Sequence, residues 1–195
     1  MNLNDIWAEK YRPKNLSEMV LSPTNRGYFE NVVKNGSLPH LLLIGRPGIG
    51  KTSLAKVLVN ELNVEDIYIN ASDERGIDTI RNKVTSFAQT KAMFGNSKII
   101  ILDEADGLTA DSQRALRNVM EEYSATVRFI LTANNRSRII PALQSRCETV
   151  DLTIDRTSFV KQFLTILERE KVNLEKETMT EIIQNTYPDF RSAYN

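Results

Sequence analysis

The sequence predicts an α/β protein with a mostly parallel sheet of five strands flanked by helices. Short apolar runs alternate with segments of helical spacing along the first 153 residues. Strands that alternate with helices imply crossover connections, and crossovers make strands parallel. The apolar runs are also nearly continuous in Ile, Leu and Val, as expected when helices cover both faces of a sheet.

The elements can be assigned in chain order. The five expected strands are HLLLIG, DIYINA, KIIILD, VRFILTA and ETVDLT, at residues 40–45, 66–71, 98–103, 127–133 and 148–153. Helical spacing of apolar residues predicts helices at residues 52–62, 76–90 and 110–123. From about Asp155 the strand pattern stops, and amphipathic helices are expected at 155–171 and 175–186. We therefore expect an α/β domain at residues 1–153 and a small helical lid domain at 154–195.

Composition excludes several classes of function. The chain has 195 residues with 25 Lys+Arg and 25 Asp+Glu, so its net charge is zero. This balance argues against a general nucleic-acid coat, although it permits a local basic surface. One cysteine, Cys147, and one histidine, His40, leave little for an internal disulfide, a Cys/His zinc site or a Cys–His nucleophile. No apolar run approaches the roughly 20 residues that cross a bilayer, and the N-terminus lacks a signal-peptide core. We expect no membrane partner and a cytoplasmic location.

A phosphate-binding loop follows the first expected strand. GRPGIGKT, residues 45–52, matches the pattern G-x-x-x-x-G-K-[ST], with a strand before it and a helix after it. Glycines let backbone N–H groups converge on an anion, and the helix start adds its positive dipole end. We expect Lys51 to reach the outer phosphates and the Thr52 hydroxyl to ligate Mg²⁺. The residues expected at the nucleotide are Gly45, Pro47, Gly48, Ile49, Gly50, Lys51, Thr52 and Ser53.

Two carboxylates follow the third expected strand. Asp103 and Glu104 emerge where the run 99–102 ends. Paired with a phosphate loop, they predict that Asp103 holds Mg²⁺ and that Glu104 polarises the attacking water. Asn134 ends the next strand, where an amide either lies near the γ-phosphate or caps a turn. Arg146 is either a solvated side chain or a residue that reaches a neighbouring subunit's nucleotide.

Seven motifs together resemble the AAA+ ATPase family. They are WAEKYRP (7–13), GRPGIGKTS (45–53), NASDERGID (70–78), IIILDEAD (99–106), LTANN (131–135), LQSRC (143–147) and PDFR (188–191). More narrowly, they resemble the ATPase subunits of sliding-clamp loaders, both the replication factor C small-subunit group and the T-even-type phage subunit. The resemblance covers the whole chain. The combination of SRC, YRP and DERG is far more specific than the phosphate loop.

The resemblance implies roles for residues that the pattern alone leaves undecided. Tyr11, Arg12 and Pro13 match the segment beside the adenine. Asn134 matches the first sensor of the γ-phosphate, and Arg146 matches the arginine finger given to the adjacent subunit. Arg191 matches the second sensor, which reaches the same subunit's ATP from the lid.

The resemblance also implies partners. Members of the family assemble as pentamers and use ATP and Mg²⁺ to load a ring-shaped clamp onto primer–template DNA, contacting DNA phosphates. Basic candidates for DNA contact, each equally a solvated charge, are Arg75, Arg81, Lys83 and Arg114. Met93 and Phe94 are candidates for clamp contact or for packing.

One departure and several alternatives remain. The family's helical collar domain does not appear before the sequence ends at Asn195, so we expect ATP binding with weak hydrolysis by this chain alone. A branch-migration motor is the nearest alternative. The DEAD sequence at 103–106 resembles a helicase motif, but such helicases need two tandem motor domains. A non-hydrolysing structural subunit would usually lack Lys51 or the acidic pair, and all three residues are present. The host cytoplasm, for a viral source, or a eukaryotic nucleus is also compatible.

Overall fold

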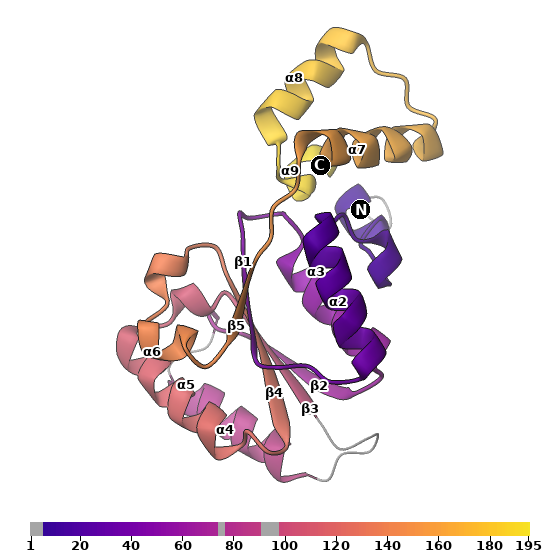
Figure 1. Ribbon diagram of the computed structural model, residues 1–195. Coiled ribbons are helices and arrows are strands. Elements are labelled where there is room, and N and C mark those ends of the chain that lie inside the picture. The colour runs from indigo at the N-terminus through magenta and orange to yellow at the C-terminus, as the bar shows by residue number, and fades with distance from the viewer. Residues whose placement is uncertain (1–5, 74–76, 91–97) are drawn as a thin grey trace.

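A computed structural model describes residues 6–73, 77–90 and 98–195. Figure 1 shows a sheet with helices on both faces and a separate group of helices beyond one edge of it. The strands are β1 (Leu41–Ile44), β2 (Glu65–Asn70), β3 (Lys98–Asp103), β4 (Val127–Ala133) and β5 (Glu148–Asp151). They form one parallel sheet in the order β2-β3-β4-β1-β5, which confirms the predicted five-stranded parallel sheet.

The register of the strands brings their polar ends together. Ile44 at the end of β1 pairs with Ala133 of β4, and Asn70 of β2 pairs with Asp103 of β3. The carboxyl ends of these parallel strands therefore meet at one edge of the sheet, where ligands bind in open α/β folds.

Two apolar cores lie on opposite faces of the sheet. Leu41 and Leu43 pack into one core with α2 (Pro23–Asn35) and α3 (Lys51–Leu62). Leu42 and Ile44 pack into the other with α4 (Ile77–Gln89) and α5 (Ala110–Glu122). Successive side chains of a strand point to opposite faces, so a strand buried on both sides is apolar throughout.

Helices α3, α4 and α5 agree with the segments expected at 52–62, 76–90 and 110–123. The apolar pattern does not predict helix α2, although the ends of this helix carry ordinary signals. Ser22 caps its start by accepting from the Asn25 N–H, Pro23 is its first residue, and Gly36 ends it at φ +61°. Only Phe29 and Val32 of this helix are buried, and most of its other residues are polar, so few apolar positions indicate a helix. The shorter helices are α1 (Trp7–Lys10), η2 (Leu16–Glu18), η3 (Ala105–Gly107), η4 (Arg136–Arg138) and α6 (Pro141–Gln144).

Three helices follow the sheet. They are α7 (Arg156–Glu170), α8 (Lys176–Thr186) and α9 (Phe190–Tyr194), and their own core contains Phe163, Leu167 and Ile183. In Figure 1, α9 lies beside α7, and the N-terminal segment lies between these helices and the sheet. Within the described ranges, no helix is long and apolar enough to cross a membrane.

Candidate nucleotide-binding site

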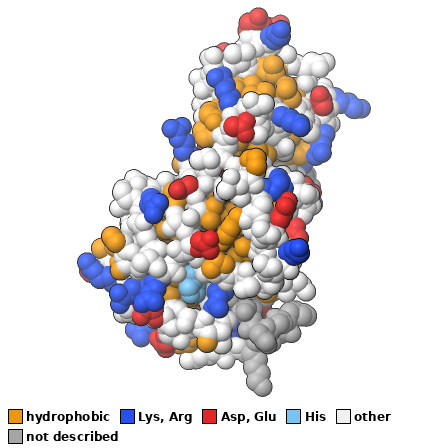
Figure 2. All heavy atoms as spheres, viewed as in Figure 1, with side chains coloured by type: hydrophobic (Ala, Val, Ile, Leu, Met, Phe, Trp, Pro, Cys, Tyr) orange, Lys and Arg blue, Asp and Glu red, His pale blue; other side chains and the backbone are white. Residues whose placement is uncertain are grey.

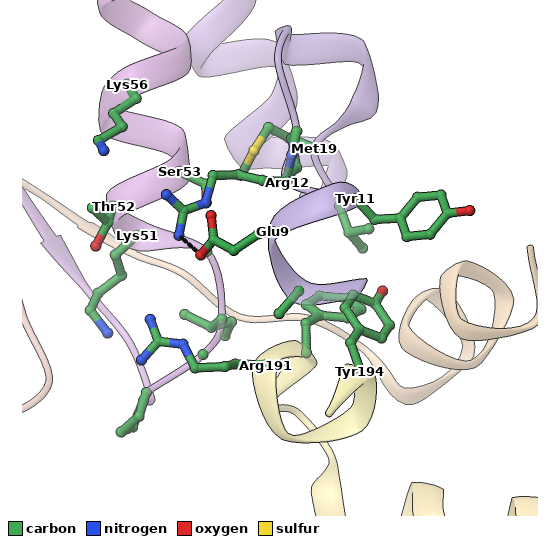
Figure 3. Close-up of a pocket in the computed structure, with 18 of the residues that line it drawn as sticks. Glu9, Tyr11, Arg12, Met19, Lys51, Thr52, Ser53, Lys56, Arg191 and Tyr194 are labelled. Carbon is green, nitrogen blue, oxygen red and sulfur yellow. Dashed lines mark hydrogen bonds and ion pairs between the residues drawn. The ribbon is translucent and has the colours of Figure 1, made fainter. Parts of the chain in front are cut away.

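A cavity of about 560 Å³ lies at the carboxyl edge of the sheet. Its walls include the phosphate loop, the N-terminal segment and helix α9 (Figure 3), together with side chains from α3, α7 and the strands β2, β3 and β4. A volume of this size is typical of small-molecule and cofactor sites. The sequence-predicted residues that line it are Tyr11, Arg12, Pro13, Pro47, Gly48, Ile49, Gly50, Lys51, Thr52, Ser53, Asp103, Glu104 and Arg191.

The phosphate loop has positive φ values at two of its glycines, a conformation that other residues rarely adopt. Gly48 and Gly50 have φ values of +68° and +100°, and Gly50 immediately precedes α3. Lys51 is 8% exposed, and its Nζ donates to the carbonyl oxygens of Gly45 (2.8 Å) and Arg46 (3.0 Å). Burial lowers the pKa of Lys51, while the nearby carboxylates oppose that decrease. The Lys51 ammonium group is thus held beside a loop whose backbone N–H groups can bind an anion.

Asp103 accepts hydrogen bonds from hydroxyl groups on three different elements. Asp103 is 8% exposed, and its carboxylate accepts from Thr52 Oγ1 at 2.9 and 3.0 Å. It also accepts from Thr132 Oγ1 at 2.5 Å and from the Tyr68 hydroxyl at 2.8 Å. The predicted metal ligands Thr52 and Asp103 are therefore in direct contact. Hydroxyl and carboxylate oxygens are hard donors that suit Mg²⁺, which usually takes few protein ligands and completes its shell with phosphates and water.

Glu104 turns the chain out of β3. Its backbone is left-handed, with φ +55°, an uncommon conformation for a residue other than glycine. Its N–H donates to Thr132 Oγ1 at 3.1 Å, and its exposed side chain lines the cavity. The turn places a second carboxylate beside the first with its oxygens accessible.

The segment after β4 is tied to the same region. Asp106 is 6% exposed and accepts from the N–H groups of Asn134 (3.1 Å) and Asn135 (3.2 Å). The Asn134 side chain then accepts a 2.7 Å bond from Lys51 Nζ. Asn134 does not itself line the cavity, but it contacts the phosphate-loop lysine.

The N-terminal segment lines the cavity and also contacts helix α7. Tyr11 OH and Lys10 Nζ lie 2.6 and 2.5 Å from Glu170 Oε1, at the end of α7. The hydrogen bond to Glu170 raises the pKa of Tyr11. In Figure 3 the Tyr11 ring points away from Lys51, whereas Arg12 pairs with Glu9 at 2.6 Å beside the phosphate loop. The expected contact of residues 11–13 with adenine stays a prediction.

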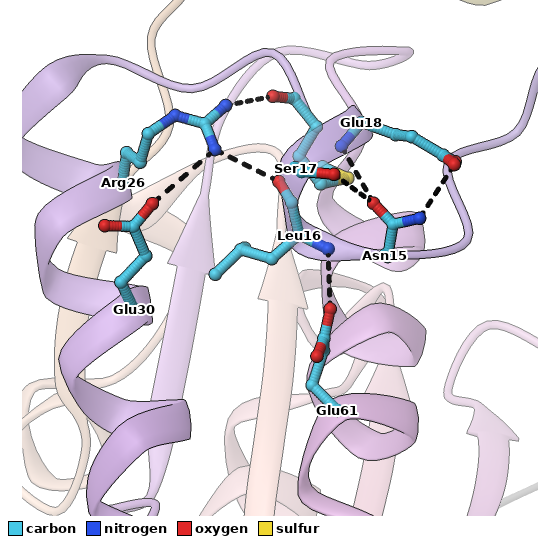
Figure 4. Close-up of polar contacts among 8 residues, drawn as sticks. Asn15, Leu16, Ser17, Glu18, Arg26, Glu30 and Glu61 are labelled. Atoms are coloured by element: carbon cyan, nitrogen blue, oxygen red, sulfur yellow. Dashed lines mark hydrogen bonds and ion pairs between the residues drawn. The ribbon is translucent and has the colours of Figure 1, made fainter.

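A second set of bonds fixes the following turn (Figure 4). Arg26 of α2 donates to the carbonyl oxygens of Leu16 (3.2 Å) and Met19 (2.6 Å). The Leu16 N–H donates to Glu61 Oε1 of α3 at 2.9 Å. Met19 and the adjacent Val20 are thereby held against the cavity.

Helix α9 contacts the phosphate loop directly. The Phe190 N–H donates to the Gly48 carbonyl oxygen at 3.2 Å. Asp189 caps α9 by accepting from the Ser192 N–H (3.1 Å) and hydroxyl (2.8 Å). Figure 3 shows the Arg191 side chain extending toward Lys51. Helix α9 therefore places a guanidinium group in the cavity.

The remaining predicted residues lie elsewhere. Arg146 does not line the cavity; its side chain is 54% exposed and pairs with Glu121 of α5 at 2.7 Å. Arg81, Lys83 and Arg114 are exposed on α4 and α5, and Arg114 pairs with Asp111. Figure 2 shows Lys and Arg side chains gathered over α5 and α6. Arg75, Met93 and Phe94 lie outside the described residues.

Several lining residues were not predicted from the sequence. They are Met19, Lys56, Tyr68, Thr132, Gln162, Phe190 and Tyr194, among others. Thr132 could have been predicted, because it lies two residues before the candidate Asn134. Tyr68 carried no such signal, since aromatic residues are ordinary in strands.

Comparisons with known proteins agree with this geometry. The family model of the ATPase family associated with various cellular activities (AAA) matches residues 41–154. Replication factor C small subunits of Staphylothermus marinus and Methanococcus vannielii are 44% and 45% identical, each over 97% of this chain. The chain spans 60% and 62% of their lengths.

A solved structure shows the same fold. The Thermotoga maritima RuvB Holliday junction branch migration motor matches with a TM-score of 0.74 and 20% identity, over 94% of this chain and 63% of that one. This match and the family model confirm the predicted nucleotide-binding α/β fold. The chain belongs to the ATPase family associated with various cellular activities (AAA).

Proposed function

We propose that this chain is an ATPase subunit of a sliding-clamp loader, which couples ATP binding and hydrolysis to opening a clamp and loading it on primer–template DNA. The observation that carries the proposal is the contact of Thr52 with Asp103 beside the phosphate loop, in a chain about 44% identical to replication factor C small subunits. The relatives extend beyond the region matched here, so the assignment of their whole activity to this chain is part of the proposal.

The geometry supports binding of Mg·ATP. The loop at 45–52 would cradle the phosphates, with Lys51 as its cation. Thr52 and Asp103 would hold Mg²⁺, which neutralises phosphate charge when bound. Glu104 has an accessible carboxylate next to that ligand pair and would orient the attacking water. Asn134 contacts Lys51, which supports a role in sensing the γ-phosphate.

The location of the arginines supports assembly with other subunits. Arg191 lies in the cavity and would act on the chain's own nucleotide. Arg146 is outside the cavity and exposed, which supports a role at a neighbouring subunit's nucleotide. The exposed basic side chains on α4 and α5 are the candidates for contact with DNA phosphates, which require charge rather than base recognition. We propose a location in the cytoplasm, or in the nucleus for a eukaryotic source.

The alternatives have weaker support. The branch migration motor shares the fold at only 20% identity, whereas the loader subunits share 44–45%. Lys51, Asp103 and Glu104 are all placed at the cavity, which favours hydrolysis over a purely structural subunit.

A matched set of ATPase measurements tests the proposal. The ATPase rate of the chain assembled with its partner subunits is measured under four conditions. These are no addition, the sliding clamp of the same source, primed DNA, and clamp and primed DNA together. We expect clamp and primed DNA together to increase the rate most. Stimulation by a four-way DNA junction, with no effect of the clamp, would instead identify a branch-migration motor.

A further inference from the structure

We infer that Tyr68 is a positioning residue for the Asp103 carboxylate, and that it increases the affinity of the nucleotide site for Mg²⁺. The inference rests on the proposed function, because it takes Asp103 as a metal ligand. It adds a residue that lies outside the phosphate loop and outside the acidic motif.

The hydrogen bond from Tyr68 to Asp103 joins two neighbouring strands, β2 and β3. Tyr68 lies on β2 opposite Ile101 of β3, while Asp103 is two residues further along β3. The phenol spans that offset, and its hydroxyl donates to Asp103 Oδ2 at 2.8 Å. Tyr68 is 44% exposed as a residue, so its ring is not held by burial in the core. The position of its hydroxyl depends on local contacts.

Helix α3 supplies one of those contacts. Thr52 and Lys56 are four residues apart and therefore lie on the same face of the helix. Thr52 Oγ1 donates to Asp103, and Lys56 Nζ lies 4.9 Å from the centre of the Tyr68 ring. A cation at that distance over an aromatic face is attracted to it. One helical face thus contacts both the carboxylate and the tyrosine that donates to it.

The donors around Asp103 differ in origin. Thr52 belongs to the phosphate loop, and Thr132 is 1% exposed in β4, where its hydroxyl also accepts from the Glu104 N–H. Tyr68 instead comes from the edge strand β2 and is 44% exposed. A carboxylate with two oxygens has about four acceptor positions, so it accommodates all three hydroxyl groups. Tyr68 is the donor that can be removed without altering the phosphate loop or the buried strand.

A donor to a metal-ligating carboxylate fixes its orientation and contributes to metal affinity. Removal of such a partner typically reduces metal affinity by about 10–100-fold. Because Tyr68 shares Asp103 with two other hydroxyl groups, we expect the lower end of that range. Binding of nucleotide in the absence of metal depends on the phosphate loop and is expected to be unchanged.

Tyr68→Phe tests the inference because it keeps the ring and its contact with Lys56 and removes only the hydroxyl. Binding of a fluorescent ATP analogue is titrated in EDTA and then at increasing Mg²⁺, and Mn²⁺ binding to the nucleotide complex is measured by electron paramagnetic resonance. We expect the half-saturating concentration of either metal to increase about tenfold, with the affinity in EDTA unchanged. Tyr123→Phe, at the end of α5 and away from the cavity, is the matched control.

The possible outcomes are distinct. An unchanged metal dependence in Tyr68→Phe would overturn the inference and leave the proposed function intact. An equal loss of affinity in EDTA and in Mg²⁺ would also overturn it, since that result indicates damage to the phosphate loop. Failure of the wild-type chain to bind nucleotide would contradict the proposed function itself.

Discussion

Substitution of Gly48 by alanine would test the contact between helix α9 and the phosphate loop. Gly48 has φ +68°, and a Cβ atom there would lie 1.6 Å from Asp189 Oδ1 and 2.2 Å from its Cγ. Gly36, at the end of α2, has φ +61°, and a Cβ atom added there would meet nothing within 4 Å. Both glycines have a left-handed backbone, and of the two only Gly48 also faces Asp189.

The expected costs follow from these contacts. Alanine in the left-handed region costs about 1 kcal/mol at either position. At Gly48 the Asp189 side chain must also leave its place. It then loses its bonds to Ser192, and such a cap contributes about 1 kcal/mol. If α9 moves with it, the Phe190–Gly48 hydrogen bond is lost, at about 1 kcal/mol more. We therefore expect about 3 kcal/mol for Gly48→Ala and about 1 kcal/mol for Gly36→Ala.

Urea unfolding measures both free energies, and hydrogen exchange of the Phe190 amide reports whether α9 has left the loop. Gly48→Ala should accelerate that exchange, whereas Gly36→Ala should not. Asp189→Gly removes the clashing side chain, and glycine is tolerated at a helix cap. The double variant Gly48→Ala with Asp189→Gly should therefore cost less than the sum of the two single changes.

Equal destabilisation by Gly48→Ala and Gly36→Ala would refute this reasoning. So would strict additivity in the double variant, because it would show that Asp189 and position 48 do not interact.

Three further predictions concern single side chains. His40 Nδ1 accepts from the Phe129 N–H, and burial lowers the pKa of His40 to about 4. The neutral imidazole therefore contributes at most about 3 kcal/mol to the free energy of unfolding; this contribution is complete above pH 6.5 and is lost as pH falls through 4. The free energy of unfolding of His40→Gln should therefore depend less on pH between 6.5 and 4 than that of the wild type. Glu104→Gln should retain ATP binding and reduce turnover by about 100-fold or more; normal turnover would exclude Glu104 as the base. Arg146→Ala should leave binding of the chain's own nucleotide unchanged and reduce hydrolysis in the assembled complex by about 1000-fold; a variant complex as active as wild type would remove Arg146 from the mechanism.

The residue pattern predicted the strands closely because their signals are local. Each of the five strands lies within two residues of its expected run, since burial on both faces requires continuous apolar residues. The phosphate loop was equally readable, because Gly48 and Gly50 adopt positive φ values that few other residues tolerate. Helix α2 was not predicted because most of its residues are polar and it buries only Phe29 and Val32.

The assignments of Tyr11, Arg146 and Arg191 came from family resemblance, and their chemistry alone did not distinguish them from surface residues. The structure places Arg191 in the cavity and Arg146 outside it. It also directs the Tyr11 hydroxyl to Glu170, 159 positions away. Contacts of that range depend on how α7 packs over the N-terminal segment, which no local pattern encodes.

By itself, the sequence determined the alternation of strands and helices, the phosphate loop and the acidic residues after β3, because each depends on neighbouring residues and on burial. Only the tertiary structure decided that Tyr68 reaches Asp103, that Lys51 contacts Asn134 and that Asp189 occupies the space beside Gly48. The sheet order β2-β3-β4-β1-β5 places β1 beside β4, so the phosphate loop after β1 meets the end of a strand that is not consecutive with it in the chain. The contact of Tyr68 with Asp103 depends on the register of β2 and β3, and that of Asp189 with Gly48 depends on how α9 packs against the loop. The distances between those side chains are set by packing of the whole domain.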